Sequence, residues 1–214
     1  MPQSMPDMQE PPLTPQDAAA TIRRITTWDE ALRHRTAGLM WMTWAFISAG
    51  TFMAYSLVGA VHHEMPPWIG FVWMPWAIPG ILITFLLWRS VGAVLPRGAP
   101  ALRTFAAYVG GFLAVTVGGV AVVVALDLPL YPPTMVLLGL GTATTVIGIA
   151  QSRRHRTGLI VAGIGLAMAG VAVWEATALN GAAFMEGVHQ AALLNAPVAG
   201  LSLLLVGLTQ YFRT

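Results

Sequence analysis

Two short segments of the sequence carry histidine and carboxylate side chains at spacings that suit a metal site. His62, His63 and Glu64 stand together between two apolar runs, while Glu186 and His189 stand three residues apart at the start of another. Side chains at positions i and i+3 share a helix face, and a glutamate–histidine pair at that spacing recurs among the metal ligands of helical bundles. The candidate metal-binding residues are therefore His62, His63, Glu64, Glu186 and His189.

Copper and zinc are the metals that this set would favour. Imidazole suits zinc or copper, and the thioether of a nearby methionine suits copper(I). Glu175 would reach the same layer, because it lies about 27 Å along a helix that starts at Thr157. The same residues also fit a hydrated rim without any metal, since polar side chains gather where membrane helices end. We therefore predict no resident cofactor, with copper or zinc as the alternative, and no catalytic residues.

The composition requires a membrane environment for the elements that position these residues. Of the 214 residues 56% are hydrophobic and only 9% are charged, whereas a soluble domain has about 25% charged residues. Six apolar runs are each close to the ~20 residues that cross the hydrocarbon core as a helix. These predicted spans lie near residues 37–61, 68–88, 104–126, 132–151, 157–179 and 188–212.

The arginines fall on alternate connections between the predicted spans, and lysine is absent. By the positive-inside rule, both termini and the arginine-bearing connections are cytoplasmic, in a multi-pass protein of the cell membrane. The spans then form three hairpins. The arginines that we expect to contact lipid phosphates are Arg23, Arg24, Arg33, Arg35, Arg153, Arg154 and Arg156.

Three regions are predicted along the chain: a disordered tail (1–13), an amphipathic juxtamembrane helix (14–35) and the transmembrane domain (36–214). Thr14 followed by a proline and an acid is typical of a helix start. A second start signal at Thr27 has the spacing of a capping box, so the amphipathic helix is expected to break there. Its predicted position is on the membrane surface, and a solvated linker helix is the alternative.

Small residues predict close contacts between helices. Glycine and alanine recur four residues apart in the third span and, in the fifth, at Gly158 with Ala162 and at Gly163 with Ala167. Such spacing lets helix backbones approach each other in lipid. The ends of the fourth and sixth spans share a pattern that includes Gln151 in one and Gln210 in the other. We interpret the three hairpins as an internal repeat, and the alternative is that arginine and glycine recur for independent reasons.

The sequence predicts a membrane helical bundle but points to no particular reaction. The leading hypothesis is a non-enzymatic accessory, sensory or assembly subunit that acts through helix–helix contacts. The alternative is a small-solute or metal-ion carrier that uses the histidine and glutamate layer, and a lipid-active enzyme comes third. Expected partners are the lipid bilayer and a membrane protein or second copy. Nucleic acid is excluded, because no compact basic domain with interleaved aromatic residues is present.

Overall fold

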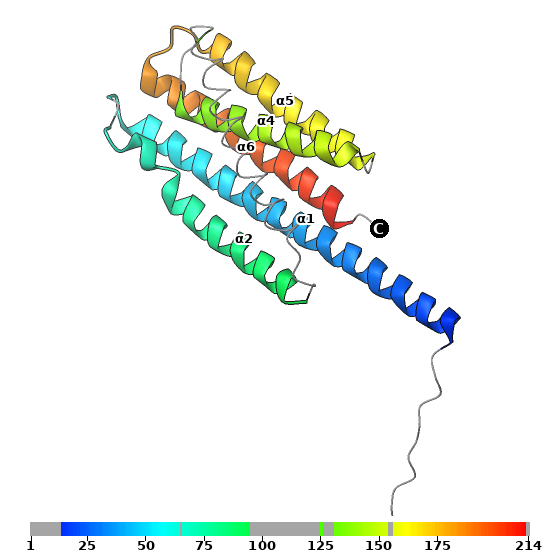
Figure 1. Cartoon of the computed structure of the whole chain (residues 1–214). Helices are drawn as coiled ribbons and strands as arrows, with labels where there is room; N and C mark the ends of the chain where they lie inside the picture. Colours follow the sequence, from blue (N-terminus) through cyan, green and yellow to red (C-terminus); the bar gives the residue numbers. More distant parts are fainter. Residues whose placement is uncertain (1–13, 65, 95–124, 126–130, 154–155, 213–214) are drawn as a thin grey trace, which may run out of the picture.

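The computed structural model describes residues 14–64, 66–94, 125, 131–153 and 156–212 (Figure 1). Across these ranges the chain is helical and no strand occurs. In chain order the elements are α1 (Pro15–Val61), the short 3-10 helix η1 (Ile69–Phe71), α2 (Met74–Val94), α4 (Pro132–Ser152), α5 (Thr157–Ala178) and α6 (Phe184–Tyr211).

Four helices of the described chain, α1, α4, α5 and α6, are long and apolar enough to cross a membrane. A shorter apolar stretch, Met74–Leu87, lies in α2. The predicted all-helical class is confirmed, and these helices suggest a membrane-embedded protein. The predicted third span (104–126), apart from residue 125, and the tail (1–13) lie outside the described residues, so the count of six spans stays a prediction.

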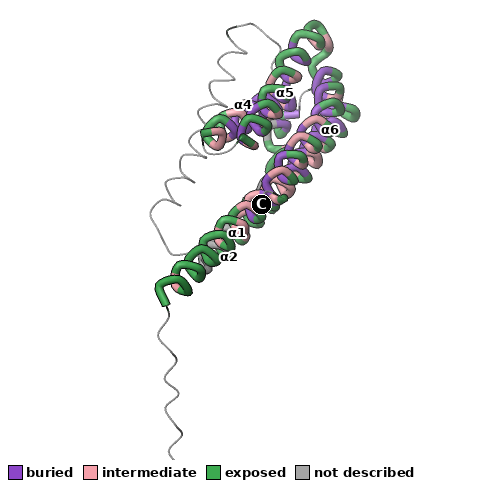
Figure 2. The backbone as a smooth tube through the Cα atoms, turned by 90° about the vertical axis from the view of Figure 1, so that its right-hand side faces the viewer, coloured by how far each residue is buried: buried purple, intermediate pink, exposed green. Residues whose placement is uncertain are grey.

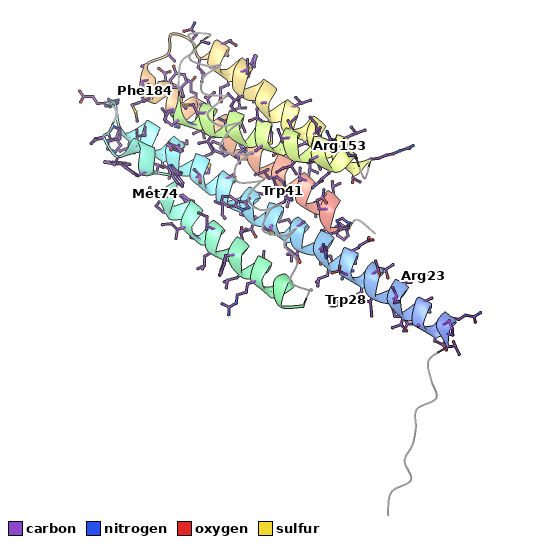
Figure 3. All side chains as sticks on the ribbon, in the orientation of Figure 1. Arg23, Trp28, Trp41, Met74, Arg153 and Phe184 are labelled. Carbon is purple, nitrogen blue, oxygen red and sulfur yellow. The ribbon has the colours of Figure 1, made fainter. Side chains whose placement is uncertain are left out.

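The long helices run along one another and give the bundle two distinct ends (Figure 1). α1 ends and α6 begins at one of them, which we name the histidine end after His62 and His189. α4 ends and α5 begins at the other, which we name the arginine end after Arg153 and Arg156. Figure 3 shows Arg153 and Phe184 at these opposite ends.

α1 is one continuous helix of 47 residues, so the predicted break at Thr27 is wrong. The Thr27 hydroxyl donates to the backbone oxygens of Arg23 (3.1 Å) and Arg24 (3.0 Å) in the preceding turn, and therefore does not cap a new helix. An ion pair between Arg33 and Asp29 at 2.9 Å also bridges this region along the helix. The predicted start is confirmed, because the Thr14 side chain accepts from the backbone nitrogen of Asp17.

The second apolar helix begins later than its predicted start near residue 68. Residues Ile69–Phe71 form η1, and α2 starts at Met74. Pro75 therefore lies in the first turn of α2, where its missing N–H removes no intrahelical hydrogen bond. α2 packs on α1 through a hydrogen bond from Trp44 Nε1 to Thr84 Oγ1 at 3.0 Å.

Among the described helices, the most extensive contacts join α1 to α6 and α4 to α5. These contacts do not confirm the predicted arrangement of the spans in three hairpins, which stays a prediction. Glycines explain both contacts. A Cβ atom added to Gly38 would lie 2.7 Å from the backbone oxygen of Gly207, and one added to Gly148 would lie 2.7 Å from that of Gly158. Backbones this close leave no room for a side chain, so these positions define the two pairs.

In both pairs, small residues meet again at the same spacing along the helices. Seven residues further along each helix, Gly141 faces Gly165 in the α4–α5 pair, and Gly200 lies near Ala45 in the α1–α6 pair. Of the predicted small-residue pairs in α5, Gly158 with Ala162 lies in the contact with α4. Gly163 is exposed and has nothing within 4 Å of an added Cβ, so the second predicted pair takes no part in packing among the described residues.

Buried residues follow the inner faces of the pairs (Figure 2). Many large apolar side chains are exposed on the outside, among them Phe46, Leu57, Ile160 and Leu201. One core cluster includes Phe52, Leu137, Met168 and Leu203, and so draws on α1, α4, α5 and α6. A second includes Tyr55, Tyr131, Met185 and Val188 and lies toward the histidine end. An apolar exterior around a packed interior is the arrangement expected of helices in lipid.

Substituting alanine for Gly158 is expected to destabilise the protein by about 1–3 kcal/mol, because the new methyl group would overlap the backbone of α4. An added Cβ would overlap the backbone nitrogen of Ser152. Gly163→Ala, on the same helix with open space around it, is the matched control and should leave stability unchanged or slightly raised. Reversible unfolding in mixed micelles would measure both, and equal effects would contradict the packing described here.

Candidate functional site

A buried polar cluster lies where α4, α5 and α6 meet. Thr134 Oγ1 donates to Glu175 Oε2 at 2.9 Å, and Asn195 Nδ2 donates to the same oxygen at 3.0 Å. Glu175 is 1% exposed and Asn195 0% exposed. Each of the three helices contributes one residue, so the cluster joins the α4–α5 pair to the α1–α6 pair.

Local sequence explains how each residue reaches this position. Thr134 follows Pro132 and Pro133 in the first turn of α4, which proline is well suited to start. Glu175 lies one turn before the end of α5 at Ala178. Asn195 lies within the otherwise apolar middle of α6, two residues before Pro197. All three side chains point into the bundle, because the exposed faces of these helices carry apolar residues.

Two acceptor atoms in this cluster have no hydrogen-bond partner in the described part of the chain. They are Glu175 Oε1 and Asn195 Oδ1, and both atoms are buried. Buried polar atoms are nearly always paired in folded proteins, and leaving one unpaired costs about 1–3 kcal/mol. Unpaired atoms on two groups that already share a hydrogen bond mark this cluster as the candidate site.

Glu175 therefore differs from its predicted role. The sequence places it in a layer of polar residues at the end of the bundle, whereas the structure turns its carboxyl group inward. Tyr131 is the residue before α4 and lies three residues before Thr134 in the chain. Its hydroxyl donates to the backbone oxygens of Leu179 (3.1 Å) and Ala182 (3.4 Å), which ties the start of α4 to the α5–α6 loop. Burial raises the pKa of Tyr131, and the negative charge of Glu186 raises it further.

The predicted metal-binding residues are at the histidine end but do not form one cluster. No group of three or more histidine, aspartate or glutamate side chains that could hold a metal occurs among the described residues. The His62 ring lies edge-on to Trp68, with ring centroids 5.5 Å apart. His63 and Glu64 are exposed.

The other two predicted ligands also have partners of their own. Glu186 accepts a hydrogen bond from Gln190 Nε2 at 3.0 Å. His189 Nδ1 lies 2.9 Å from the backbone oxygen of Ser56 and 3.1 Å from its hydroxyl. A carbonyl oxygen only accepts, so this ring nitrogen carries the hydrogen and joins α6 to α1.

The predicted phosphate-binding arginines divide into two groups. Arg23, Arg24, Arg33 and Arg35 lie on α1, while Arg153 and Arg156 flank the connection between α4 and α5. All six are exposed, and Arg154 lies outside the described residues. Arg23 lies on the part of α1 that extends past the bundle (Figure 3). Lipid contact by these side chains stays a prediction.

A second, partly buried polar contact lies at the arginine end. Gln210 Nε2 donates to Gln151 Oε1 at 2.9 Å, and Gln210 is buried. These are the two glutamines that occupy corresponding places in the shared pattern at the ends of the fourth and sixth predicted spans. The contact joins α4 to α6, so the two helix pairs are bridged by polar side chains near both ends.

Fold and site together define an all-helical protein with helices suited to a membrane and a buried acid–amide cluster between them. Comparison of the chain with known protein families, curated proteins and solved structures finds no match. The contacts within this chain are therefore the basis for its proposed function.

Replacing Thr134 with valine should destabilise the protein by about 1–2 kcal/mol, because Glu175 loses a donor that comes from another helix. Thr144→Val is a control on the same helix: that hydroxyl is equally buried but bonds to its own helix at Leu140, 2.7 Å away. The control should lose about half as much or less. Reversible unfolding in mixed micelles gives both values, and a larger loss in the control would contradict the assignment.

Proposed function

We propose that this protein is a non-enzymatic membrane subunit that binds a partner protein through the N-terminal part of α1. This part, residues 15–30, extends past the bundle (Figures 1 and 2). The observation that carries the proposal is an uncovered row of large apolar side chains on it. Ile22, Ile25 and Trp28 are 64%, 61% and 57% exposed. Apolar side chains gathered on one helix face outside a folded core are typical of a surface that a partner covers.

Helix continuity favours a protein over the membrane surface as the occupant. A helix that lies on a bilayer surface must turn sharply away from the transmembrane segment that follows it. α1 has no break between its extension and the segment that packs against α6. The apolar row therefore continues in the direction of the transmembrane helix, away from the lipid.

The spacing of the row fits a helical partner. Ile22 and Ile25 belong to a set of positions that recur at alternating intervals of four and three residues, which is the pattern of a coiled-coil seam. The set is Ala18, Ile22, Ile25, Asp29 and Leu32, and Trp28 lies next to it in the sequence. Asp29 interrupts the seam with a charge. In a parallel pair of identical chains the two Asp29 carboxylates would face each other, so the row favours a helix of a different protein with a basic residue at that level.

We also propose that the arginine end faces the cytoplasm and that the chain crosses the membrane six times. All eleven basic residues are arginines, and those that are described lie toward the arginine end or on the α1 extension. α2 runs antiparallel to α1, since Trp76 contacts Gly50 and Thr84 contacts Trp44. α2 therefore ends near the arginine end whereas α4 begins at the histidine end, which supports a further crossing between them.

Photocrosslinking in native membranes tests the partner. A photoreactive phenylalanine analogue at Ile25 should yield one discrete adduct with another membrane protein, and Ile22→Asp should abolish it. The matched control is the same analogue at Thr26, the exposed next residue on a different face of α1. The attached peptide, identified by mass spectrometry, should have a coiled-coil seam with a basic residue opposite Asp29. An adduct of twice the chain's mass, adducts with lipid alone, or equal yield from Thr26 would refute the proposal.

Single-cysteine labelling tests the orientation, and the chain suits it because it contains no cysteine. A membrane-impermeant maleimide should react with His63→Cys in intact cells, because the histidine end faces outward in the proposed orientation. Thr26→Cys should react only after permeabilisation. Both positions are exposed. Labelling of position 26 but not 63 in intact cells would reverse the proposed orientation.

A further inference from the structure

We propose that Glu175 is a proton-binding site, at which a neutral carboxyl group forms a cyclic hydrogen-bonded pair with the side-chain amide of Asn195. Nothing in the proposed partner-binding role of α1 requires this site.

Each of the two groups has one oxygen atom that lacks a hydrogen-bond donor among the described residues. Glu175 Oε2 accepts from Thr134 Oγ1 at 2.9 Å and from Asn195 Nδ2 at 3.0 Å. Glu175 Oε1 and Asn195 Oδ1 remain, and both are buried acceptors without a partner among the described residues. An ionised carboxylate can only accept, whereas a protonated one donates through its O–H. One proton on Oε1, donated to Asn195 Oδ1, would therefore satisfy both atoms at once.

No described charge faces the cluster to stabilise a carboxylate there. α4 has no ionisable side chain, and α5 has none except Glu175 itself. On α6, Glu186 is about 13 Å and His189 about 9 Å along the axis from Asn195, at 1.5 Å per residue. His189 is also bonded to Ser56. Tyr55 of α1 is in the core cluster toward the histidine end and is neutral at ordinary pH.

A buried carboxylate held by two neutral donors would be costly, because a charge removed from water needs an opposite charge or several strong donors. Taking up a proton from water removes that cost and completes the pairing of both groups. Release of the proton to water leaves the charge and the unpaired amide oxygen at the junction of α4, α5 and α6. Proton binding therefore favours close contact between the α4–α5 pair and the α1–α6 pair.

Infrared spectroscopy of the full chain in lipid nanodiscs tests the protonation state directly. The spectrum should contain the carbonyl-stretch band of a neutral carboxyl group at neutral pH, and glutamate labelled with ¹³C in its side-chain carboxyl should shift that band. Glu175→Gln should abolish it, while Glu64→Gln and Glu186→Gln, which alter exposed glutamates, should leave it in place. Asn195→Leu should shift it to higher wavenumber, because the carboxyl group loses its amide partner. Absence of a glutamate-derived neutral carboxyl band in the folded wild type would refute the proposal.

Thermal unfolding across pH provides a second readout. Stability of the wild type should fall as pH rises, because the folded state holds a proton that the unfolded chain releases. Glutamine has the shape and the donor of the protonated side chain, so Glu175→Gln should fold and should lose this pH dependence. The same measurement with sodium replaced by choline distinguishes a proton from a metal cation. Sodium-dependent stability that disappears in Glu175→Gln would show a cation site and overturn the proposal.

Discussion

Close approach of helix backbones is the constraint on which the rest of this structure depends. Lipid provides no hydrophobic force that pushes helices together, so their association requires packing contacts and hydrogen bonds between them. Gly148 opposite Gly158 and Gly38 opposite Gly207 bring two pairs of backbones into contact. Because the chain forms two such pairs, the weakest part of the bundle is the junction between them, and the interhelical polar contacts there become important.

The polar contacts between the pairs differ in chemistry. At the arginine end two neutral amides, Gln151 and Gln210, meet in a hydrogen bond that does not change with pH. Near the histidine end the contact includes Glu175, a group that can gain or lose a charge. The contact between the two glutamines therefore keeps the same charge at every pH, whereas the charge of the contact that includes Glu175 can change. This asymmetry would let the pairs separate at one end while the other end stays joined, which is how many membrane proteins alternate between states.

Composition and periodicity predict the helices well, because helix length and apolar character follow directly from the bilayer's thickness. Thr14 as a helix cap and Gly158 with Ala162 as a contact were also predictable from local rules. The direction in which a side chain points was not predictable from these rules. Glu175 has the spacing of a residue at a helix end, and only the packing of α4 and α6 against α5 shows that it faces inward. Asn195 could have been noticed as an amide within an apolar run, but its partner is 20 residues away in the chain.

The unbroken course of α1 has a mechanical consequence. The part of α1 before Thr36, residues 15–35, forms an arm of about 32 Å, at 1.5 Å per residue, that is rigidly attached to the part of the helix packed against α6. A tilt of roughly ten degrees in the packed part would displace the tip of this arm by roughly 6 Å, since no hinge intervenes to absorb the motion. A small tilt of the packed part of α1 would thus produce a larger displacement of the N-terminal tip of the same helix.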